Sequence, residues 1–360
     1  MDLPIGRAVL TAATLVALTL GLASQASARG LTAPVTAGPP RQLTVKHLDF
    51  DGFFPSTTKI HVGDRVSWSI NGFHTVSILP AGKPPPQLIM PALTNPIIGK
   101  LDAAGAPMWF NAQPNQIINP AVAAPSGGKV YAGKGFLNSG LPAPTNGPPP
   151  PFVVKFTKAG TFTFHCLVHP GMQGVVKVLP KRKKVPSALQ DRLAADAQAT
   201  AAVREARVLA KVKPAAATVL AGNDGAGAVT WLRFFPEKLR VKAGTTVDFR
   251  ISSRREVHTI TLGPAAYTTQ IENTFTAPSP NPAGPPTLVV NPFGAYPSDP
   301  PPLPPYTGAN HGNGFEGAGI LAPAGGPLPA DAKITFTKPG VYHFECVIHA
   351  NMDGTVTVTK

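Results

Sequence analysis

Alternating apolar and polar residues recur along the chain in short runs. Clear examples in the first half are VSWSI, HTVSIL, FVVKFT, TFTFHC and GVVKVL. A period of two places successive side chains on opposite faces of a β-strand. The Lys-Ala-Gly and Lys-Pro-Gly sequences that precede two of the later runs are typical of turns. The pattern predicts an all-β chain of short antiparallel strands packed as sandwiches.

The same pattern occurs twice. Phe53-Phe54-Pro55 matches Phe234-Phe235-Pro236, FHTVSIL matches VHTITLG, and FTKAGTFTFHCLVHPGM matches FTKPGVYHFECVIHANM. The offset between the copies is nearly constant, which indicates a tandem duplication. We therefore expect one domain over residues 41–180 and a second over residues 214–360.

Residues 181–213 differ in composition from both copies. This segment is rich in alanine and charge, with Pro186 near its start and Pro214 after its end, which predicts a basic helical linker. Its expected apolar stripe is narrow and consists of Leu189, Leu193, Ala197 and Ala201.

Each copy also carries a long insert rich in proline and glycine. The inserts leave 91 residues between His74 and Cys166, and 87 between His258 and Cys346. Loops of this length are usually functional or disordered. The apolar sequence Met108-Trp109-Phe110 predicts that the first insert is at least partly packed.

The N-terminus has the pattern of a secretory signal. A short basic start is followed by the apolar run AVLTAATLVALTLGLA and by Ala26-Ser27-Ala28, which suits cleavage after Ala28. We expect residues 1–28 to be a signal peptide and the protein to be exported to the periplasm, the cell envelope or the outside of the cell.

The chain has a formal net charge of +14, with a concentration of Lys and Arg in residues 181–213. No nucleic-acid-binding motif accompanies this basic segment, so a solvated connector is favoured and no nucleic-acid partner is expected. The charge leaves open an acidic partner protein or association with the anionic envelope surface. The sequence does not define the oligomeric state.

Both cysteines of the chain lie in one repeated frame, Cys-x-x-His-x-x-Met. The frame occurs in HCLVHPGM, residues 165–172, and in ECVIHANM, residues 345–352. A further histidine, His74 or His258, lies in an earlier strand of each copy. Two imidazoles, a thiolate and a weak axial thioether form the ligand set of a blue-copper electron-transfer site.

Two other uses of the cysteines are less favourable. A disulfide would have to join equivalent positions inside two separate domains, with their Cα atoms within about 7 Å of each other. A tetrahedral zinc site is disfavoured because each copy offers one cysteine and its methionine suits zinc poorly.

The two copies resemble cupredoxins, the plastocyanin–azurin family of type 1 copper proteins, and the spacing of the frame is similar to the short ligand loop of amicyanin. The resemblance implies two tandem Greek-key cupredoxin β-sandwiches joined by a short helical linker, with two type 1 copper ions per chain. Thr75 and Thr259 stand where many members have Asn, so the hydrogen bonds around the ligands are expected to differ. The implied ligands are His74, Cys166, His169 and Met172 in the first copy, and His258, Cys346, His349 and Met352 in the second.

The expected function is one-electron exchange with a redox partner protein, with His169 and His349 in exposed loops as the electron ports. No catalytic residue is assigned. One alternative is a copper oxidoreductase, similar to nitrite reductases or small laccases, with an extra copper near His165, as a mononuclear site from His165, His311 or His343 across an interface. The chain has no His-x-His pair, and His165 is expected on an outward strand face. A second alternative is a copper-buffering envelope protein.

Overall fold

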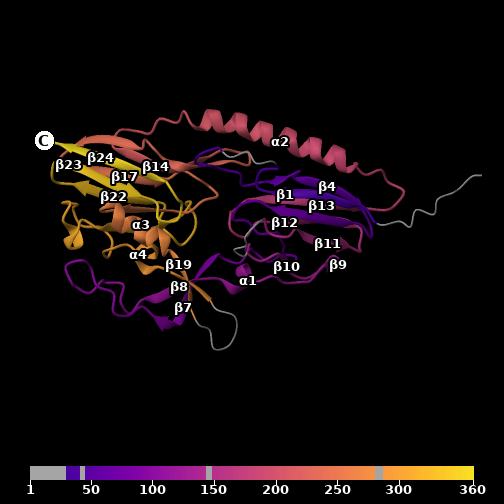
Figure 1. Cartoon of the computed structure of the whole chain (residues 1–360), viewed down its shortest axis with the longest axis horizontal. Coiled ribbons are helices and arrows are strands. Elements are labelled where there is room, and N and C mark those ends of the chain that lie inside the picture. Colours follow the sequence, from indigo (N-terminus) through magenta and orange to yellow (C-terminus); the bar gives the residue numbers. More distant parts are fainter. Residues whose placement is uncertain (1–29, 41–44, 143–147, 280–286) are drawn as a thin grey trace, which may run out of the picture. The chain divides into compact units, whose positions relative to one another are not determined.

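The computed structural model describes residues 30–40, 45–142, 148–279 and 287–360. The predicted signal peptide, residues 1–28, lies outside this part of the chain. Strands dominate the described residues and form five sheets, of which four make up two β-sandwiches (Figure 1). The all-β fold class predicted from the sequence is confirmed. No helix among these residues is long and apolar enough to cross a membrane.

The first sandwich is built from two five-stranded sheets whose inward side chains form one core. One sheet has the order β3-β1-β5-β11-β9, formed by Phe53–Phe54, Thr32–Ala37, Arg65–Ile70, Phe152–Phe156 and Val130–Tyr131. The other has the order β10-β6-β12-β13-β4, formed by Leu137–Asn138, Ser77–Ile78, Gly160–His165, Gln173–Leu179 and Thr57–His61. Strand β1 thus lies ahead of residue 41, where the first domain was expected to begin.

The second sandwich repeats this plan. One sheet has the order β2-β15-β14-β17-β22, formed by Leu48–Asp49, Thr230–Phe235, Thr218–Asp224, Thr245–Ile251 and Asp331–Phe336. The other has the order β16-β24-β23-β18-β21, formed by Lys238–Lys242, Asp353–Thr359, Gly340–Glu345, His258–Leu262 and Glu316–Leu321. Strand β2 comes from the first half of the chain but pairs with β15, so the two halves share a sheet.

The duplication is visible in the packing of the two cores. The Phe164 ring lies 5.3 Å from the Trp68 ring, and the Phe344 ring lies 5.2 Å from the Phe249 ring, both edge to face. Each of these phenylalanines is two residues before the cysteine of its copy. The alternation of the strand therefore turns the cysteine toward the same core as the phenylalanine.

The two long inserts meet in the fifth sheet. Its order is β19-β20-β8-β7, formed by Thr276–Ser279, Thr287–Val290, Pro114–Ile118 and Ile89–Pro96. Val289 of the second insert pairs with Ile117 of the first. The part of the first insert that was predicted to pack does so, because Met108 and Phe110 are buried.

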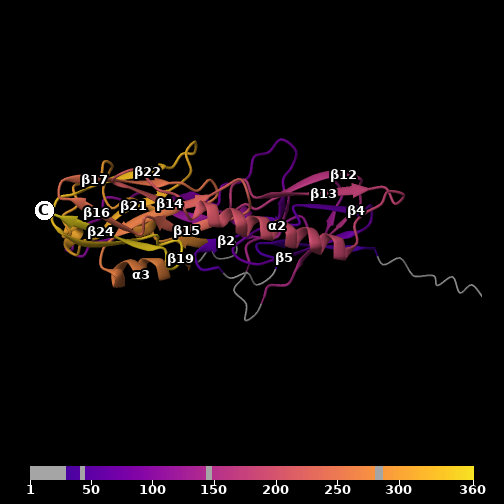
Figure 2. The same ribbon diagram turned by 90° about the horizontal axis from the view of Figure 1, so that it is seen from above.

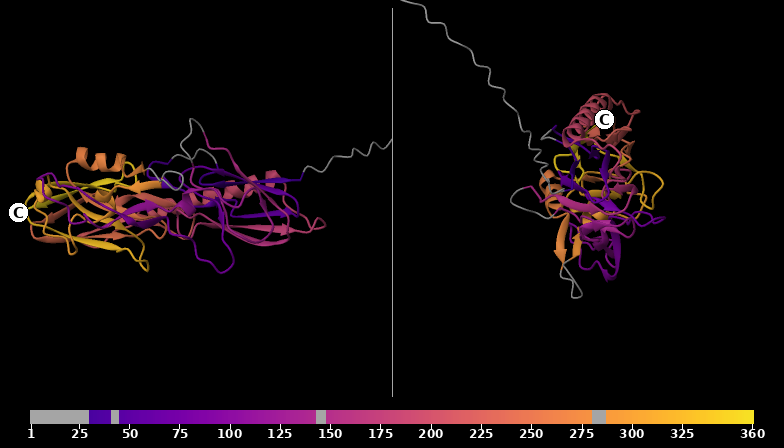
Figure 3. Two further views of the ribbon diagram at one scale, coloured as in Figure 1. Left: turned by 90° about the horizontal axis from the view of Figure 1, so that it is seen from below. Right: turned by 90° about the vertical axis from the view of Figure 1, so that its right-hand side faces the viewer.

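Helices are few and cover the outside of the sandwiches. Helix α3 packs on β23 of the second sandwich (Figure 3). In the described part of the chain the helices are α1 (Pro120–Ala123), α2 (Ala188–Leu209), α3 (Ala265–Asn273) and α4 (Pro292–Ala295), with one 3-10 turn at Asn310–Gly312. Helix α2 begins at a capping box in which Ser187 and Gln190 satisfy each other's backbone N–H groups.

Helix α2 contacts both sandwiches, through β1 and β3 on one side and β14 and β15 on the other (Figure 2). The predicted apolar stripe is wrong: Leu189 and Leu193 are more than half exposed, and Ala197 and Ala201 are exposed as well. The small alanine side chains let the helix backbone approach the aromatic rings of Phe50, Phe54 and Trp231 closely. The helix therefore packs on the sandwiches through its alanine face and not through its leucines. The buried stripe is Ala195, Ala199, Ala202 and Ala206.

Candidate metal centres

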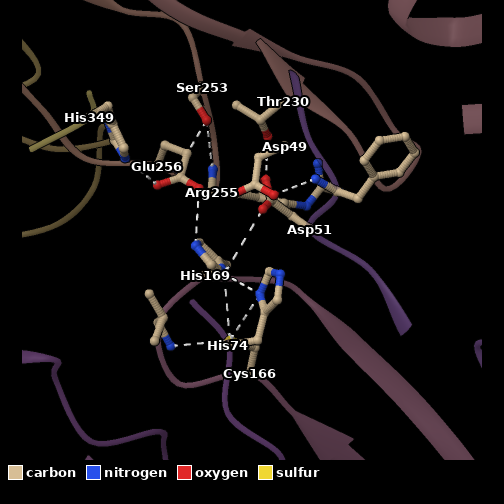
Figure 4. Close-up of polar contacts among 12 residues, drawn as sticks. Asp49, Asp51, His74, Cys166, His169, Thr230, Ser253, Arg255, Glu256 and His349 are labelled. Carbon is tan, nitrogen blue, oxygen red and sulfur yellow. Dashed lines mark hydrogen bonds and ion pairs between the residues drawn. The ribbon is translucent and has the colours of Figure 1, made fainter. Parts of the chain in front are cut away.

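Three donor atoms converge in the first sandwich. His74 lies in the turn before β6, Cys166 directly follows β12, and His169 lies in the loop before β13. The Nδ1 atoms of the two histidines are 2.9 Å apart, and the Cys166 Sγ lies 4.0 Å from that of His74 and 3.5 Å from that of His169 (Figure 4). All three side chains are buried. One first-row metal ion, with bonds of roughly 2.0–2.3 Å to nitrogen and sulfur, needs donors at about this spacing.

The second sandwich brings together the equivalent atoms. The Nδ1 atoms of His258 and His349 are 3.1 Å apart, and the Cys346 Sγ lies 3.7 Å and 3.5 Å from them, respectively. The Nε2 atoms of His74 and His258 are buried without a hydrogen-bond partner, so the Nδ1 side is the side of these rings that is engaged. Both cysteines are free thiols inside separate cores, so neither forms a disulfide.

A tight loop places the methionine under each cluster. The Cys166 N–H donates to the Met172 carbonyl at 2.9 Å, and the Met172 N–H donates to the His169 carbonyl at 3.1 Å. The equivalent bonds around Cys346, His349 and Met352 are 2.9 Å and 3.2 Å. Both methionines are buried in the same core as their cysteine. Six of the eight residues predicted from the sequence thus gather into two groups that could hold a metal ion, and a methionine follows in the same loop and core of each; this donor set fits copper.

A threonine organises each cysteine loop. The Thr75 hydroxyl accepts the Leu167 N–H at 2.7 Å, and the Thr75 N–H donates to the Cys166 Sγ at 3.4 Å. Thr259 accepts the Val347 N–H at 2.8 Å, and its own N–H lies 3.4 Å from the Cys346 Sγ. Thr75 and Thr259 thus each connect the two segments of their copy that carry the candidate ligands.

The surroundings favour the metal-binding form of each cysteine. Burial raises the pKa of the Cys166 thiol, but hydrogen bonds from His169 and His74 outweigh it and hold that pKa well below its ordinary value. For Cys346, burial likewise raises the pKa, and the charge of His349 with two histidine hydrogen bonds lowers it well below the ordinary value. The thiolate is the form that binds a metal ion.

A buried carboxylate lies between the two clusters. The Glu256 Oε1 is 3.1 Å from the Nε2 of His169, and its Oε2 is 3.4 Å from the Nε2 of His349 (Figure 4). Burial alone would raise the pKa of Glu256, but the charge and hydrogen bonds of these two histidines hold it well below its usual range. Burial lowers the pKa of His349, and the charge of Cys346 and the contact with Glu256 raise it to about 10.

A second buried acid lies beside the first cluster only. Asp51, between β2 and β3, accepts a hydrogen bond from the Thr230 hydroxyl on β15, and its Oδ1 is 3.9 Å from the Nδ1 of His169. Burial raises the pKa of Asp51, and the charge of Glu256 raises it further, to about 7. Neither Glu256 nor Asp51 was predicted from the sequence. The one local signal was Glu256 itself, two residues before His258, in a loop that is three residues longer than in the first copy.

The two ligand loops are exposed at Pro170, Gly171, Ala350 and Asn351, but the histidines that they carry are not. The exposed fraction of His169 is 3%, and the side chain of His349 is 15% exposed. The two ligand loops turn toward each other around Glu256, which removes both rings from most of their contact with water. The Nε2 atoms of both rings therefore face the carboxylate of Glu256.

The other candidate histidines do not build a further copper site with His165. His165 is half-buried on β12, burial lowers its pKa, and it belongs to none of the metal-ligating groups found in the described part of the chain. His343 lies 3.6 Å from Glu345. His311 lies between the carboxylates of Asp102 and Asp299, at 3.3 Å and 2.9 Å.

The first insert shields the second cluster. Met108 and Phe110 pack with Phe315 and Val347 in one apolar group, and Val347 directly follows Cys346. The Trp109 Nε1–H donates to the Pro297 carbonyl at 2.7 Å and holds the insert in place. Exclusion of water around a metal ligand influences the redox potential of the site.

Comparisons with known proteins give partial likenesses in structure. No protein-family model and no curated protein sequence matches the chain. A mutant plastocyanin of fern is 22% identical, with 39% of this chain and 99% of that chain covered and a TM-score of 0.21. A mutant amicyanin in its Cu(I) form is 16% identical, with 42% and 89% covered and a TM-score of 0.22. A purple cupredoxin from Nitrosopumilus maritimus is 17% identical, with 39% and 98% covered and a TM-score of 0.20.

Proposed function

We propose that the chain is a cupredoxin-like copper protein with two type 1 sites that exchanges single electrons with a redox partner. The observation that supports this most is the repetition of one cluster of two imidazoles and a thiolate, with nearly the same spacing, in two buried places. The first site would be held by His74, Cys166, His169 and Met172, and the second by His258, Cys346, His349 and Met352.

The residues suit a metal that changes its charge by one. Copper, when bound, supplies the one-electron couple. The cysteine thiolates and methionine thioethers are soft donors that favour Cu(I), and the imidazoles accept both oxidation states. The hydrogen-bonded loops of Thr75 and Thr259 fix the donors from both sides, so that little rearrangement accompanies electron transfer.

Electron transfer fits the clusters better than catalysis does. The cysteine and methionine of each cluster lie in the hydrophobic core of their sandwich, where a substrate has no approach. Among the described residues, neither His165 nor His343 belongs to a group that could hold an extra copper, and His311 groups only with the carboxylates of Asp299 and Glu316, a donor set less suited to copper than the two clusters.

The test is the copper content and the visible absorption spectrum of the chain from residue 29 to 360, loaded with Cu(II). The proposal expects two copper ions per chain and an intense thiolate-to-copper band. A third copper without added colour would support the oxidoreductase alternative. A colourless protein would contradict the proposal.

We also propose that the protein acts outside the cytoplasm, with residues 1–28 as the signal that exports it. N-terminal sequencing of the protein isolated from its native cells is the test, and it should read from Arg29. A chain that retains residues 1–28 and stays with the cytoplasmic fraction would contradict export.

A further inference from the structure

Glu256 is the one residue whose side chain contacts a candidate ligand from each sandwich among the described residues. Its two carboxylate oxygens face the Nε2 atoms of His169 and His349, at 3.1 Å and 3.4 Å (Figure 4). The opposite ring nitrogens, the Nδ1 atoms, face the cysteine sulfurs. A continuous series of side chains therefore runs from Cys166 through His169, Glu256 and His349 to Cys346.

The loop around Glu256 is held in place by its own hydrogen bonds. The Ser253 Oγ accepts the Glu256 N–H at 3.0 Å and donates to the Asp224 Oδ2 at 3.1 Å. The same Asp224 oxygen accepts the Arg254 N–H at 2.8 Å. Glu256 is 5% exposed, so water does not compete for its oxygens. Each oxygen of this buried carboxylate lies within ion-pair distance of one histidine ring, although Oε1 makes no regular hydrogen bond, so Glu256 is a fixed bridge and not a mobile surface charge.

The contacts also fix the protons of the two rings. A carboxylate only accepts hydrogen bonds, so each Nε2 carries the proton and each Nδ1 is left to bind a metal ion. In metal sites, a partner of this kind on the outer ring nitrogen orients the histidine and increases its basicity. Here one partner does this for two histidines, so a change at either cluster acts on the same carboxylate.

We propose that Glu256 is a positioning residue that connects the two copper sites and carries electron exchange between them, an inference that rests on the proposed function. In this exchange one site is oxidised by one electron and the other is reduced by the same electron. Both Nε2 protons stay on their rings and the carboxylate keeps its charge, so no further reactant is needed. The two sites then act as one two-electron unit in which an electron received at either cluster reaches the other.

The experiment compares the rate of this exchange in three variants, each with Met172→Leu added so that the two sites differ in potential and absorption. The doubly loaded protein is reduced by a short radical pulse, and the redistribution of absorbance between the two bands is followed. Glu256→Gln keeps the volume but loses one acceptor oxygen, and Glu256→Asp keeps the charge but is too short to reach both rings. Glu316→Gln is the control, because Glu316 is a fully buried carboxylate that belongs to neither of the two candidate copper clusters.

The bridge predicts that the rate constant falls on the order of tenfold or more in both Glu256 variants and stays unchanged in Glu316→Gln. An equal rate in Glu256→Gln and the control would overturn the proposal. So would a normal rate in Glu256→Asp, which would show that charge and not contact matters. Copper content is measured first on each protein: an unsubstituted chain with fewer than two coppers contradicts the proposed function, whereas two coppers with an unaltered exchange rate contradict only the bridge.

A second measurement does not depend on electron transfer. In the diamagnetic Cu(I) protein, the Nε2 protons of His169 and His349 should both give slowly exchanging NMR signals. Glu256→Asp should lose at least one of them, and Glu316→Gln should keep both. Retention of both signals in Glu256→Asp would contradict the geometry on which the bridge depends.

Discussion

The two candidate metal clusters have nearly the same internal geometry but different surroundings. Their histidine rings lie 4.7 Å and 4.8 Å apart, centroid to centroid, at interplanar angles of 66° and 61°. Around the first cluster, Asp51 adds a buried carboxylate, whereas around the second the first insert adds an aromatic cover next to Val347. The repeated sequence frame thus determines the donor spacing, and the segments that differ between the copies determine the environment. Two copies of one site can in this way acquire different redox properties without a change of ligand.

The largest expected effect comes from replacing the cysteine of one cluster at a time. Cys166→Ser should abolish copper binding with thiolate absorption at the first site and leave the second, and Cys346→Ser should do the reverse, because a type 1 band requires the thiolate. Each variant is the control for the other, measured by copper content and visible absorption. Loss of the whole band in either single variant would contradict two independently folded sites.

Removal of the aromatic cover should affect the second cluster alone. Phe110 is fully buried, and its ring lies 5.4 Å from the Phe293 ring. Phe110→Ala should destabilise this region by about 3–5 kcal/mol and admit water near Cys346. Denaturant unfolding measures the change in stability. The reduction potential of each site, followed through its own absorption band, measures the effect on the two clusters. Ile98→Ala, at a 78% exposed position in the same insert, is the matched control.

An equal shift of both potentials in Phe110→Ala would show that the insert acts on the whole molecule and not on the second cluster. The two clusters would then not differ in how the first insert shields them from water.

A buried glutamate of the second sandwich, Glu316, should make the stability of that sandwich depend on pH. Glu316 takes the place that Leu137 has in the first copy, and both are fully buried. Burial raises the pKa of Glu316 from 4.5 to about 7; the charge of Asp299 adds to this, while Asn310 and His311 oppose it. The folded state therefore binds the proton more tightly than the unfolded state. Its contribution to stability is fully present below pH 4.5 and is lost as the pH rises to about 7.

Glu316→Gln should remove this loss, which amounts to at most about 3 kcal/mol, because glutamine resembles the protonated acid. Urea unfolding at pH 4.5 and at pH 8 measures the difference. Glu237→Gln, at a more exposed position of the same sandwich, is the control and should leave the pH dependence unchanged. A variant with an unaltered pH profile would show that Glu316 does not titrate in this window.

The grouping of the candidate ligands could be anticipated from the sequence because their positions are local and repeated. Cys166, His169 and Met172 lie in one short loop, and the alternation of the preceding strand indicates which way the cysteine points. Glu256 could not be predicted in the same way, because its role depends on how two distant loops approach each other. The pairing of β2 with the second sandwich is a further consequence of that approach.

The helix α2 shows the same limit at the scale of an element. Its existence follows from composition and the capping signals at Ser187 and Gln190, which are local. Hydrophobicity selects Leu189 and Leu193 for its buried face, whereas the structure buries an alanine stripe. The choice depends on the shape of the surface against which the helix packs, and this surface is assembled from both halves of the chain.

The smallest expected effects come from the two threonines that hold the cysteine loops. Thr75→Val and Thr259→Val preserve the side-chain shape but leave the N–H of Leu167 or Val347 without its acceptor. Each should cost about 1–3 kcal/mol in the unfolding free energy of the metal-free protein, because a buried donor left unpaired loses its solvation. The acceptor distances, 2.7 Å and 2.8 Å, predict equal losses in the two halves.

The spectra should nevertheless differ between the two threonine variants. The Thr75 hydroxyl also lies 4.0 Å from the Cys166 Sγ, within hydrogen-bond range of a sulfur acceptor, so Thr75→Val should shift the absorption of the copper-loaded protein more than Thr259→Val. Unfolding curves and visible spectra of both variants test the two statements separately. Unequal stability losses together with equal spectral shifts would contradict both statements. The two clusters would then differ in the strength of the hydrogen bonds in their cysteine loops and share the same electronic surroundings of the sulfur atom.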